Sequence, residues 1–184
     1  MSDPASSNAA QHAQAAPSAW VRRWLLFAPA RGDALDVACG EGRHAHMLAA
    51  LGYRVHAVDR DARALASLTG SAGVVPIAAD IENGPWPYAG RTFDIIVVTN
   101  YLFRPLLPVL VDSVAPGGVL LYETFAAGNE RLGRPSNPAF LLRPGELLEA
   151  VRGRLRVIAY EDLEVADPRP AMVQRICAMR SHSE

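Results

Sequence analysis

Short apolar runs alternate with amphipathic segments along most of this chain, and this alternation restricts the fold more than any other feature. Apolar or β-branched runs predict strands, and apolar residues spaced three or four apart predict helices. Strand and helix repeat five times, and a further helix and two strand-like runs follow. This order predicts a mostly parallel sheet with helices on both faces. The expected strands are 34–38, 53–58, 74–79, 93–99 and 119–123, and the expected helices are 41–51, 62–68, 106–114 and 144–151.

The remaining segments complete the fold class. Residues 82–91 are rich in Pro and Gly and predict a loop. Residues 124–143 predict a much longer loop, and loops of that length in compact domains are usually functional. The runs 155–165 and 171–180 must pair antiparallel, because their connection is too short for a crossover. We therefore predict a doubly wound α/β fold with a seven-stranded sheet that ends in an antiparallel hairpin.

The start of the chain differs from the rest. Residues 1–16 are rich in Ala, Ser and Gln and predict a disordered tail. Residues 17–184 then form a single domain. Its first segment, 17–29, carries aromatic residues at helical spacing and predicts a helix. This helix either packs into the core or covers a ligand pocket as a lid, and the sequence leaves both interpretations open.

Composition excludes several function classes. The chain contains no Lys, which excludes a P-loop lysine and a Schiff-base lysine. Its formal net charge of −1 gives no basic surplus for binding nucleic acid, and no apolar run approaches the length of a membrane span. Cys39 and Cys177 are isolated and the histidines are scattered, so we expect no metal site. We expect a cytoplasmic location.

The segment between the first strand and the first helix carries most of the functional information. Gly40 and Gly42 would let the backbone approach a ligand closely, but they also fit the Gly-x-Gly-x-x-Ala pattern of dinucleotide-binding proteins. The neighbouring acids distinguish the two classes. Asp36 and Glu41 would oppose a pyrophosphate about 4 Å away by roughly 1 to 4 kcal/mol. They would attract a ligand that carries an ammonium and a sulfonium.

Two further acids end the next two strands. Asp59 can accept both hydroxyls of a ribose, which supports a nucleoside without identifying it. Asp80 could accept an adenine amino group with Ile81 against the ring, although Asp after a strand is also common in turns. Arg43, or the free N–H groups at the helix start, could bind the carboxylate of such a ligand. An exposed helix arginine is the alternative for Arg43.

Five motifs in order resemble those of the class I S-adenosylmethionine-dependent methyltransferases. They are Asp36 to Gly42, Ala57 to Asp59, Ala79 to Ile81, Phe93 to Val98 and Pro116 to Leu121. The resemblance covers about residues 34–180 and includes the terminal hairpin, which ordinary dinucleotide-binding domains lack. Residues 122–125 and 137–147 resemble the small tellurite-resistance-type branch of that superfamily. The resemblance implies S-adenosylmethionine as cofactor and a small-molecule methyl acceptor, without naming the acceptor.

The predicted site combines these motifs with the residues that follow the fourth and fifth strands. Tyr101 and Glu123 are the candidates for a catalytic base, although many methyl acceptors need little acid–base help. Asn100 and Tyr101 partly resemble the Asn-Pro-Pro-Tyr run of amino-directed methyltransferases, but the prolines are missing, so an amine acceptor does not follow. The predicted cofactor-binding residues are Asp36, Ala38, Gly40, Gly42, Arg43, Asp59, Arg60, Asp80, Ile81 and Asn100.

Two other functions remain open at this point. A nicotinamide-dependent oxidoreductase explains the glycines and Asp59, but not Asp36, Glu41 or the terminal hairpin. A non-catalytic module that binds S-adenosylmethionine fits the same residues as an enzyme does. The sequence does not give the oligomeric state.

Overall fold

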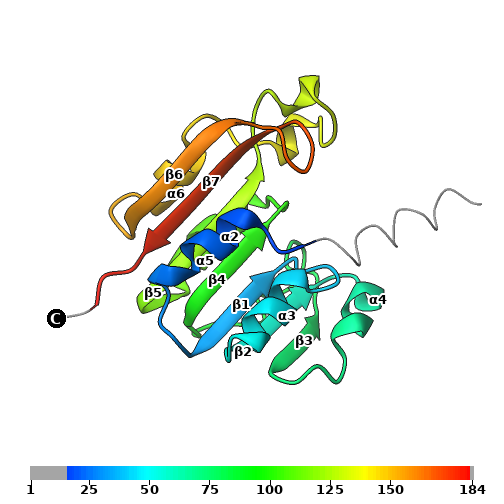
Figure 1. Cartoon of the computed structure of the whole chain (residues 1–184), viewed down its shortest axis with the longest axis vertical. Coiled ribbons are helices and arrows are strands. Elements are labelled where there is room, and N and C mark those ends of the chain that lie inside the picture. The colour runs from blue at the N-terminus through cyan, green and yellow to red at the C-terminus, as the bar shows by residue number, and fades with distance from the viewer. Residues whose placement is uncertain (1–15, 183–184) are drawn as a thin grey trace, which may run out of the picture.

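Figure 1 shows the computed structural model, which describes residues 16–182. The tail predicted for residues 1–16 lies, apart from Ala16, outside this range. Seven strands form one sheet in the order β3-β2-β1-β4-β5-β7-β6. β1 to β5 run parallel, and β7 pairs antiparallel with both β5 and β6. The predicted fold class is therefore confirmed. The strands are β1 Asp33–Val37, β2 Arg54–Asp59, β3 Val74–Ala78, β4 Phe93–Thr99, β5 Val114–Phe125, β6 Arg156–Val165 and β7 Ala171–Met179.

Helices cover both faces of the sheet. In Figure 1, α2 (Ala19–Trp24) and α3 (Arg43–Ala50) lie in front of it, and α5 (Leu107–Asp112) and α6 (Glu146–Val151) lie behind. The short helix α4 (Ala62–Leu65) shares the core of α2 and α3. Side chains of β4 alternate between the two cores, which explains why its sequence is almost continuously apolar. Short 3₁₀ turns complete the chain: η1 Leu25–Phe27, η2 Ala66–Leu68, η3 Arg104–Leu106, η4 Asn129–Arg131 and η5 Pro138–Phe140.

The strand order reverses beside β1. The chain moves from β1 outward through β2 and β3, and then returns to the other side of β1 as β4. In doubly wound sheets, ligands bind beyond the carboxyl ends of the strands at this reversal. The fold therefore places the candidate site next to the ends of β1 and β4.

The structure corrects several predicted element boundaries. α3 begins at Arg43 rather than at residue 41, because Gly42 has a left-handed φ of 77° that a helix cannot include. α6 begins at Glu146 rather than at residue 144 for the same reason, since Gly145 has a φ of 73°. β3 is followed by a loop, which confirms the loop predicted for residues 82–91, and not by the helix that five strand-helix repeats would require.

β5 begins at Val114 rather than at residue 119. Val114 pairs with Phe93 and Val119 with Ile95, so the intervening residues bulge out of the ladder. A Cβ on Gly118 would lie 2.9 Å from two carbonyl oxygens, those of Ala115 and Phe93. Glycine is required here because the backbone folds onto itself within the strand.

The N-terminal helix α2 belongs to the core. Trp20 and Val21 are buried, and the Trp20 indole N–H donates to the carbonyl of Ile176 over 3.3 Å. The guanidinium of Arg175 lies 5.0 Å from the Trp20 ring centroid. Of the two interpretations of this segment, the structure favours core packing over a lid.

Candidate functional site

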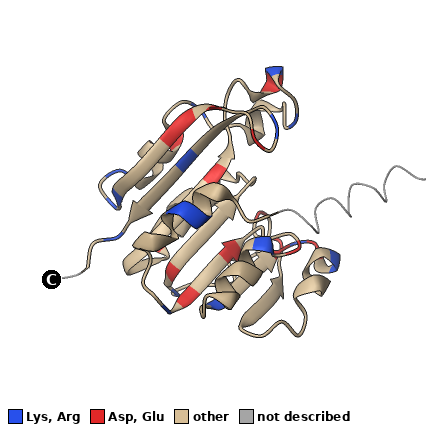
Figure 2. Ribbon diagram, in the orientation of Figure 1, with Lys and Arg blue, Asp and Glu red and all other residues tan. Residues whose placement is uncertain are grey.

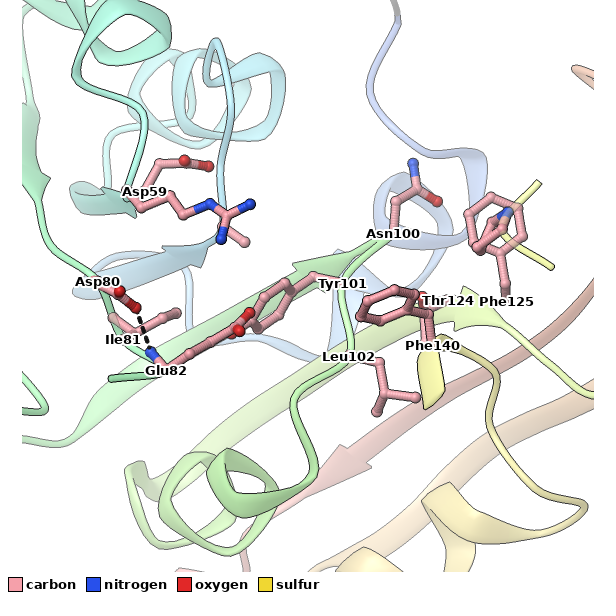
Figure 3. Close-up of a pocket in the computed structure, with 13 residues that line it drawn as sticks. Asp59, Asp80, Ile81, Glu82, Asn100, Tyr101, Leu102, Thr124, Phe125 and Phe140 are labelled. Atoms are coloured by element: carbon pink, nitrogen blue, oxygen red, sulfur yellow. Dashed lines mark hydrogen bonds between the residues drawn. The ribbon is translucent and has the colours of Figure 1, made fainter. Parts of the chain in front are cut away.

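A cavity of about 360 Å³ opens at the carboxyl ends of the parallel strands (Figure 3). Its size lies within the range of about 300 to 1,000 Å³ typical of small-molecule sites. The acidic end of the cavity consists of Ala38, Asp59, Arg60, Asp80, Ile81 and Glu82. The aromatic end consists of Leu102, Thr124, Phe125, Pro135 and Phe140. Asn100 and Tyr101 follow β4, and Figure 3 shows Tyr101 between the labelled acids and Phe140.

The backbone is strained where β1 and β4 reach the cavity. Ala38 has a φ of 51° and Asn100 a φ of 56°, and no other non-glycine residue in the described chain has a positive φ. Such conformations persist only where the surrounding structure enforces them, and they cluster at functional sites. Both residues were predicted from the sequence as cofactor-binding, and both line the cavity.

Asp59 ends β2 and lines the cavity with a fixed carboxylate. One oxygen accepts the backbone N–H of Gly40 over 2.8 Å, and the other accepts that of Asp61 over 2.9 Å. A carboxylate offers about four lone-pair positions, so each oxygen retains one for a ligand. The side chain is therefore preorganised to accept two hydroxyl groups.

Asp80 combines a turn role with a place in the cavity lining. Its carboxylate accepts the backbone N–H groups of Glu82 and Asn83 and the Asn83 amide, at 3.0 to 3.1 Å. These hydrogen bonds, led by the Asn83 side chain, hold the pKa of Asp80 below its ordinary value. The next residue, Ile81, is buried and also lines the cavity, as does the exposed Arg60.

Asp36 is a predicted cofactor-binding residue whose side chain is buried in the fold. Its side chain is only 1% exposed, is not part of the cavity lining, and accepts the N–H of Ala45 in the first turn of α3 over 2.9 Å. Burial raises the pKa of Asp36 to about 7, against the opposing effects of the Ala45 N–H and the Arg43 charge. Asp36 is a partly neutral structural group here, so the acids that face the cavity are Asp59, Asp80 and Glu82.

The two glycines after β1 have different surroundings. A Cβ on Gly40 would meet nothing within 4 Å, so this residue leaves open space beside Asp59. A Cβ on Gly42 would collide with the side chain of Leu68, so this glycine is required for packing. Arg43 donates to the Ala16 carbonyl and, at 3.5 Å, to the Thr99 hydroxyl, and it is not part of the cavity lining.

Tyr101 lines the cavity, but its phenol is not set up as a base. Burial and the neighbouring Glu82 carboxylate raise the pKa of Tyr101 above its ordinary value, so the hydroxyl keeps its proton at neutral pH. That hydroxyl is buried and has no hydrogen-bond partner among residues 16–182. The buried Tyr122 hydroxyl donates to the Tyr101 carbonyl over 2.8 Å and fixes this backbone.

Glu123, the other candidate base, is occupied by structural contacts. One oxygen accepts the Ser18 hydroxyl over 2.8 Å, and the other lies 3.2 Å from the Arg175 guanidinium. Ser18 also donates its backbone N–H to the Nε2 atom of His44, whose pKa is lowered to about 3 mainly by burial. Glu123 thus ties the start of α2 to the sheet and is not part of the cavity lining.

Sequence analysis did not single out the aromatic end of the cavity or Glu82. Pro135 and Phe140 belong to the segment after β5. The length of that loop and the resemblance of residues 137–147 to the tellurite-resistance-type branch drew attention to it, but neither gave a role to these two side chains. Nothing local in the sequence indicates which of its apolar side chains turn inward. That choice depends on contacts with segments distant in the chain.

Comparisons with known proteins agree with this architecture. Residues 34–118 match a family model described as a methyltransferase domain. No curated protein sequence matches the chain significantly. The matched range contains every residue of the acidic end, but of the aromatic end only Leu102.

Solved structures share the fold over nearly the whole chain. TehB from Haemophilus influenzae superposes with a TM-score of 0.71 and 20% identity over 91% of this chain, which spans 63% of that protein. The N-methyltransferase NodS from Bradyrhizobium japonicum gives a TM-score of 0.68 and 16% identity, over 97% of both chains. A TehB-like SAM-dependent methyltransferase from Corynebacterium glutamicum gives 0.67 and 20%, over 97% of this chain and 100% of that one. At such identities the likeness establishes the fold.

Proposed function

We propose that the chain transfers the methyl group of S-adenosylmethionine to a small-molecule acceptor. Residues 34–118 match a methyltransferase-domain model, and the fold is shared with structures of S-adenosylmethionine-dependent methyltransferases. The observation that carries the proposal is the fixed Asp59 carboxylate, which lines the cavity beside the open space at Gly40. The cavity continues from there to a second, uncharged end with room for the acceptor.

The residues of the acidic end suit this cofactor better than a dinucleotide. Asp59 and Asp80 would accept hydroxyl and amino hydrogens, which a ribose and an adenine supply. The acids there would also repel a pyrophosphate, whereas the cofactor carries an ammonium and a sulfonium and no phosphate. Ile81 supplies an apolar surface for a base.

When bound, S-adenosylmethionine supplies an activated methyl group on a positively charged sulfur. The chain's own contribution is to hold an acceptor in line with that methyl group and to keep water away. Neither Tyr101 nor Glu123 is placed as a base, so the proposed mechanism rests on positioning rather than proton abstraction.

Charge and cavity size support a small acceptor. Figure 2 shows basic and acidic residues interspersed along the ribbon, and the formal net charge is −1. A nucleic-acid substrate would favour a basic face. Among the described residues, no helix is both long and apolar enough to cross a lipid bilayer.

Calorimetric titration of the full chain with S-adenosylhomocysteine and, separately, with NADH tests the proposal. We expect saturable binding of the former and none of the latter. Transfer of a radiolabelled methyl group to thiols, oxyanions, amines and hydroxyls then tests turnover. Binding of NADH alone would identify an oxidoreductase, and homocysteine-nucleoside binding without any transfer would identify a non-catalytic module.

A further inference from the structure

The aromatic end of the cavity has a consistent chemistry. Its lining residues are Leu102, Thr124, Phe125, Pro135 and Phe140, and all five have uncharged side chains. Phe140 is 52% exposed, although a large apolar side chain on a loop gains nothing from facing water. An exposed aromatic ring at the rim of a cavity is typical of a surface that a ligand covers.

Phe140 is held from both sides by one arginine. Arg104, in η3, donates to the carbonyl of Ala139 over 2.8 Å and to that of Leu141 over 2.7 Å. The carbonyls that flank Phe140 in sequence are thus fixed by a single planar guanidinium. Lysine could not make both bonds with this geometry, because its ammonium is a point charge on a flexible stem.

Arg104 is itself fixed by a buried acid. The Glu146 carboxylate, in a residue 7% exposed, accepts from Arg104 at 2.7 and 3.0 Å and from the backbone N–H of Arg143 at 2.8 Å. Bidentate pairs of this kind are directional as well as strong. The hydrogen bonds from Arg104 to Glu146 and to the two loop carbonyls therefore set the position of Phe140.

A second buried anchor holds the other part of the same loop. Asn129 is 1% exposed, donates its amide to the Pro135 carbonyl over 2.9 Å, and accepts the Met172 N–H over 3.2 Å. Pro135 and Phe140, the two loop residues in the cavity lining, are thus both held by buried polar side chains. The long loop is a preformed wall for the acceptor.

Such a wall selects against charged acceptors. Burying a charge there without a partner is costly, whereas flat rings stack favourably on Phe faces. Arg169 lies over the Phe125 ring at 5.5 Å, but it donates to the Arg134 carbonyl and is not a lining residue. An acceptor whose lone pair is free at neutral pH would also need no base.

We propose that the aromatic end binds a flat, uncharged heteroaromatic acceptor against Phe140, and that Arg104 is the positioning residue for this wall. The inference rests on the proposed methyl transfer. The acceptor nitrogen lone pair forms the new N–C bond while the C–S bond electrons pass to sulfur. The positive charge moves from sulfur to the acceptor ring, and no proton is released.

The test uses quinoline as the neutral probe, with benzoate and benzylamine as its anionic and cationic counterparts. Binding to the full chain saturated with S-adenosylhomocysteine is measured by ligand-observed NMR. Transfer is measured with radiolabelled cofactor. We expect quinoline to bind at least tenfold more tightly than either charged probe and to accept the methyl group. Preference for a charged probe, or no quinoline binding, overturns the proposal.

Two variants and two matched controls test the wall. Phe140→Ala and Arg104→Lys should each raise the KM for quinoline at least tenfold, with a smaller change in kcat. The affinity of each variant for S-adenosylhomocysteine should stay within twofold of wild type. Leu132→Ala alters an exposed apolar residue of the same loop outside the cavity lining. Arg180→Lys alters another arginine that donates to two backbone carbonyls, those of Val114 and Val111. Both controls should behave as wild type.

The outcomes separate this inference from the proposed function. An unchanged quinoline KM in Phe140→Ala overturns the wall even if Arg104→Lys fails to fold, because Phe140 is half exposed and its truncation leaves the core intact. If the wild-type protein did not bind S-adenosylhomocysteine, the proposed function itself would be overturned.

Discussion

The two ends of the cavity are built in different ways. The acidic end consists of residues at or just after strand ends, held by backbone N–H groups of the adjoining turns: Asp80 by its own turn, and Asp59 by Asp61 and by Gly40 after the neighbouring strand. The aromatic end depends on a loop after β5, and that loop is held by Arg104 and Asn129 through contacts across the fold. The family model covers the first end and stops before the loop of the second. The acidic end is thus held at the edge of the sheet where the parallel strands end, whereas the aromatic end depends on contacts between a long loop and distant segments.

The largest expected effect concerns an acid that belongs to neither end. Asp36 has a pKa raised from 3.8 to about 7, so the folded protein holds this proton more tightly than the unfolded chain does. Because of this raised pKa, Asp36 alone lowers the unfolding free energy by roughly 4 kcal/mol as the pH rises from about 4 to about 7. In Asp36→Asn, which keeps an acceptor for Ala45, this component is absent.

Urea unfolding of both proteins at pH 4, 6 and 8 measures the difference. The stability of the variant relative to wild type should increase across this range. If the unfolding free energies of the two proteins instead changed in parallel with pH, Asp36 would be ionised in the folded state. Its negative charge would then contribute to the electrostatics of the site.

Asn129→Ala tests the aromatic end alone. The substitution removes the Asn129 amide and leaves the Pro135 carbonyl and the Met172 N–H without partners. The unfolding free energy should therefore fall by about 2 kcal/mol. Affinity for S-adenosylhomocysteine, measured by calorimetry, should stay within twofold of wild type. A matched change at the exposed Asn83, Asn83→Ala, disturbs the Asp80 turn and should affect cofactor affinity more than stability.

Asp59→Ala tests the acidic end. We expect the affinity for S-adenosylhomocysteine to fall by more than tenfold, about 1.4 kcal/mol or more, while the fold remains intact. Calorimetry measures the affinity, and circular dichroism checks the fold. Asp162→Ala, at an exposed acid on β6, is the control. Wild-type affinity in Asp59→Ala would remove the assignment of this end.

The smallest effect is expected at the glycine that opens the site. A Cβ on Gly40 has no steric neighbour within 4 Å, so Gly40→Ala should destabilise the fold by only about 1 kcal/mol, the cost of its left-handed φ of 55°. The same Cβ would occupy the space beside Asp59 and weaken cofactor binding. Thermal unfolding and calorimetry on one preparation separate the two effects, and equal losses in both would mean that the space is not a ligand site.

Five of the six residues that line the acidic end were named from the sequence, because each lies at or within three residues of the end of a strand. Their role in binding a cofactor stays a prediction. The strand-helix alternation gave the sheet, and an acid at a strand end, such as Asp59, indicates its own position. Asp36 shows the limit of that reasoning. Its position in the chain was right, but the burial that neutralises it depends on how α3 packs over β1.

The aromatic end could not be predicted in the same way. Glu123 lies in β5 two residues before its end, and Ser18 and Arg175 from distant segments occupy its oxygens. Phe140 lies in the segment 137–147 that resembles the tellurite-resistance-type branch, but nothing in that segment indicates that its side chain lines a cavity. Its place depends on Arg104 and Glu146, whose pairing joins segments that no local pattern connects.

A crystal structure of the full chain with S-adenosylhomocysteine tests the division of the cavity most directly. The account predicts ribose hydroxyls on the Asp59 carboxylate, adenine beside Asp80 and Ile81, and the sulfur turned toward Asn100 and the Phe140 wall. A nucleoside at the aromatic end, or a ligand that makes no contact with Asp59, would contradict it.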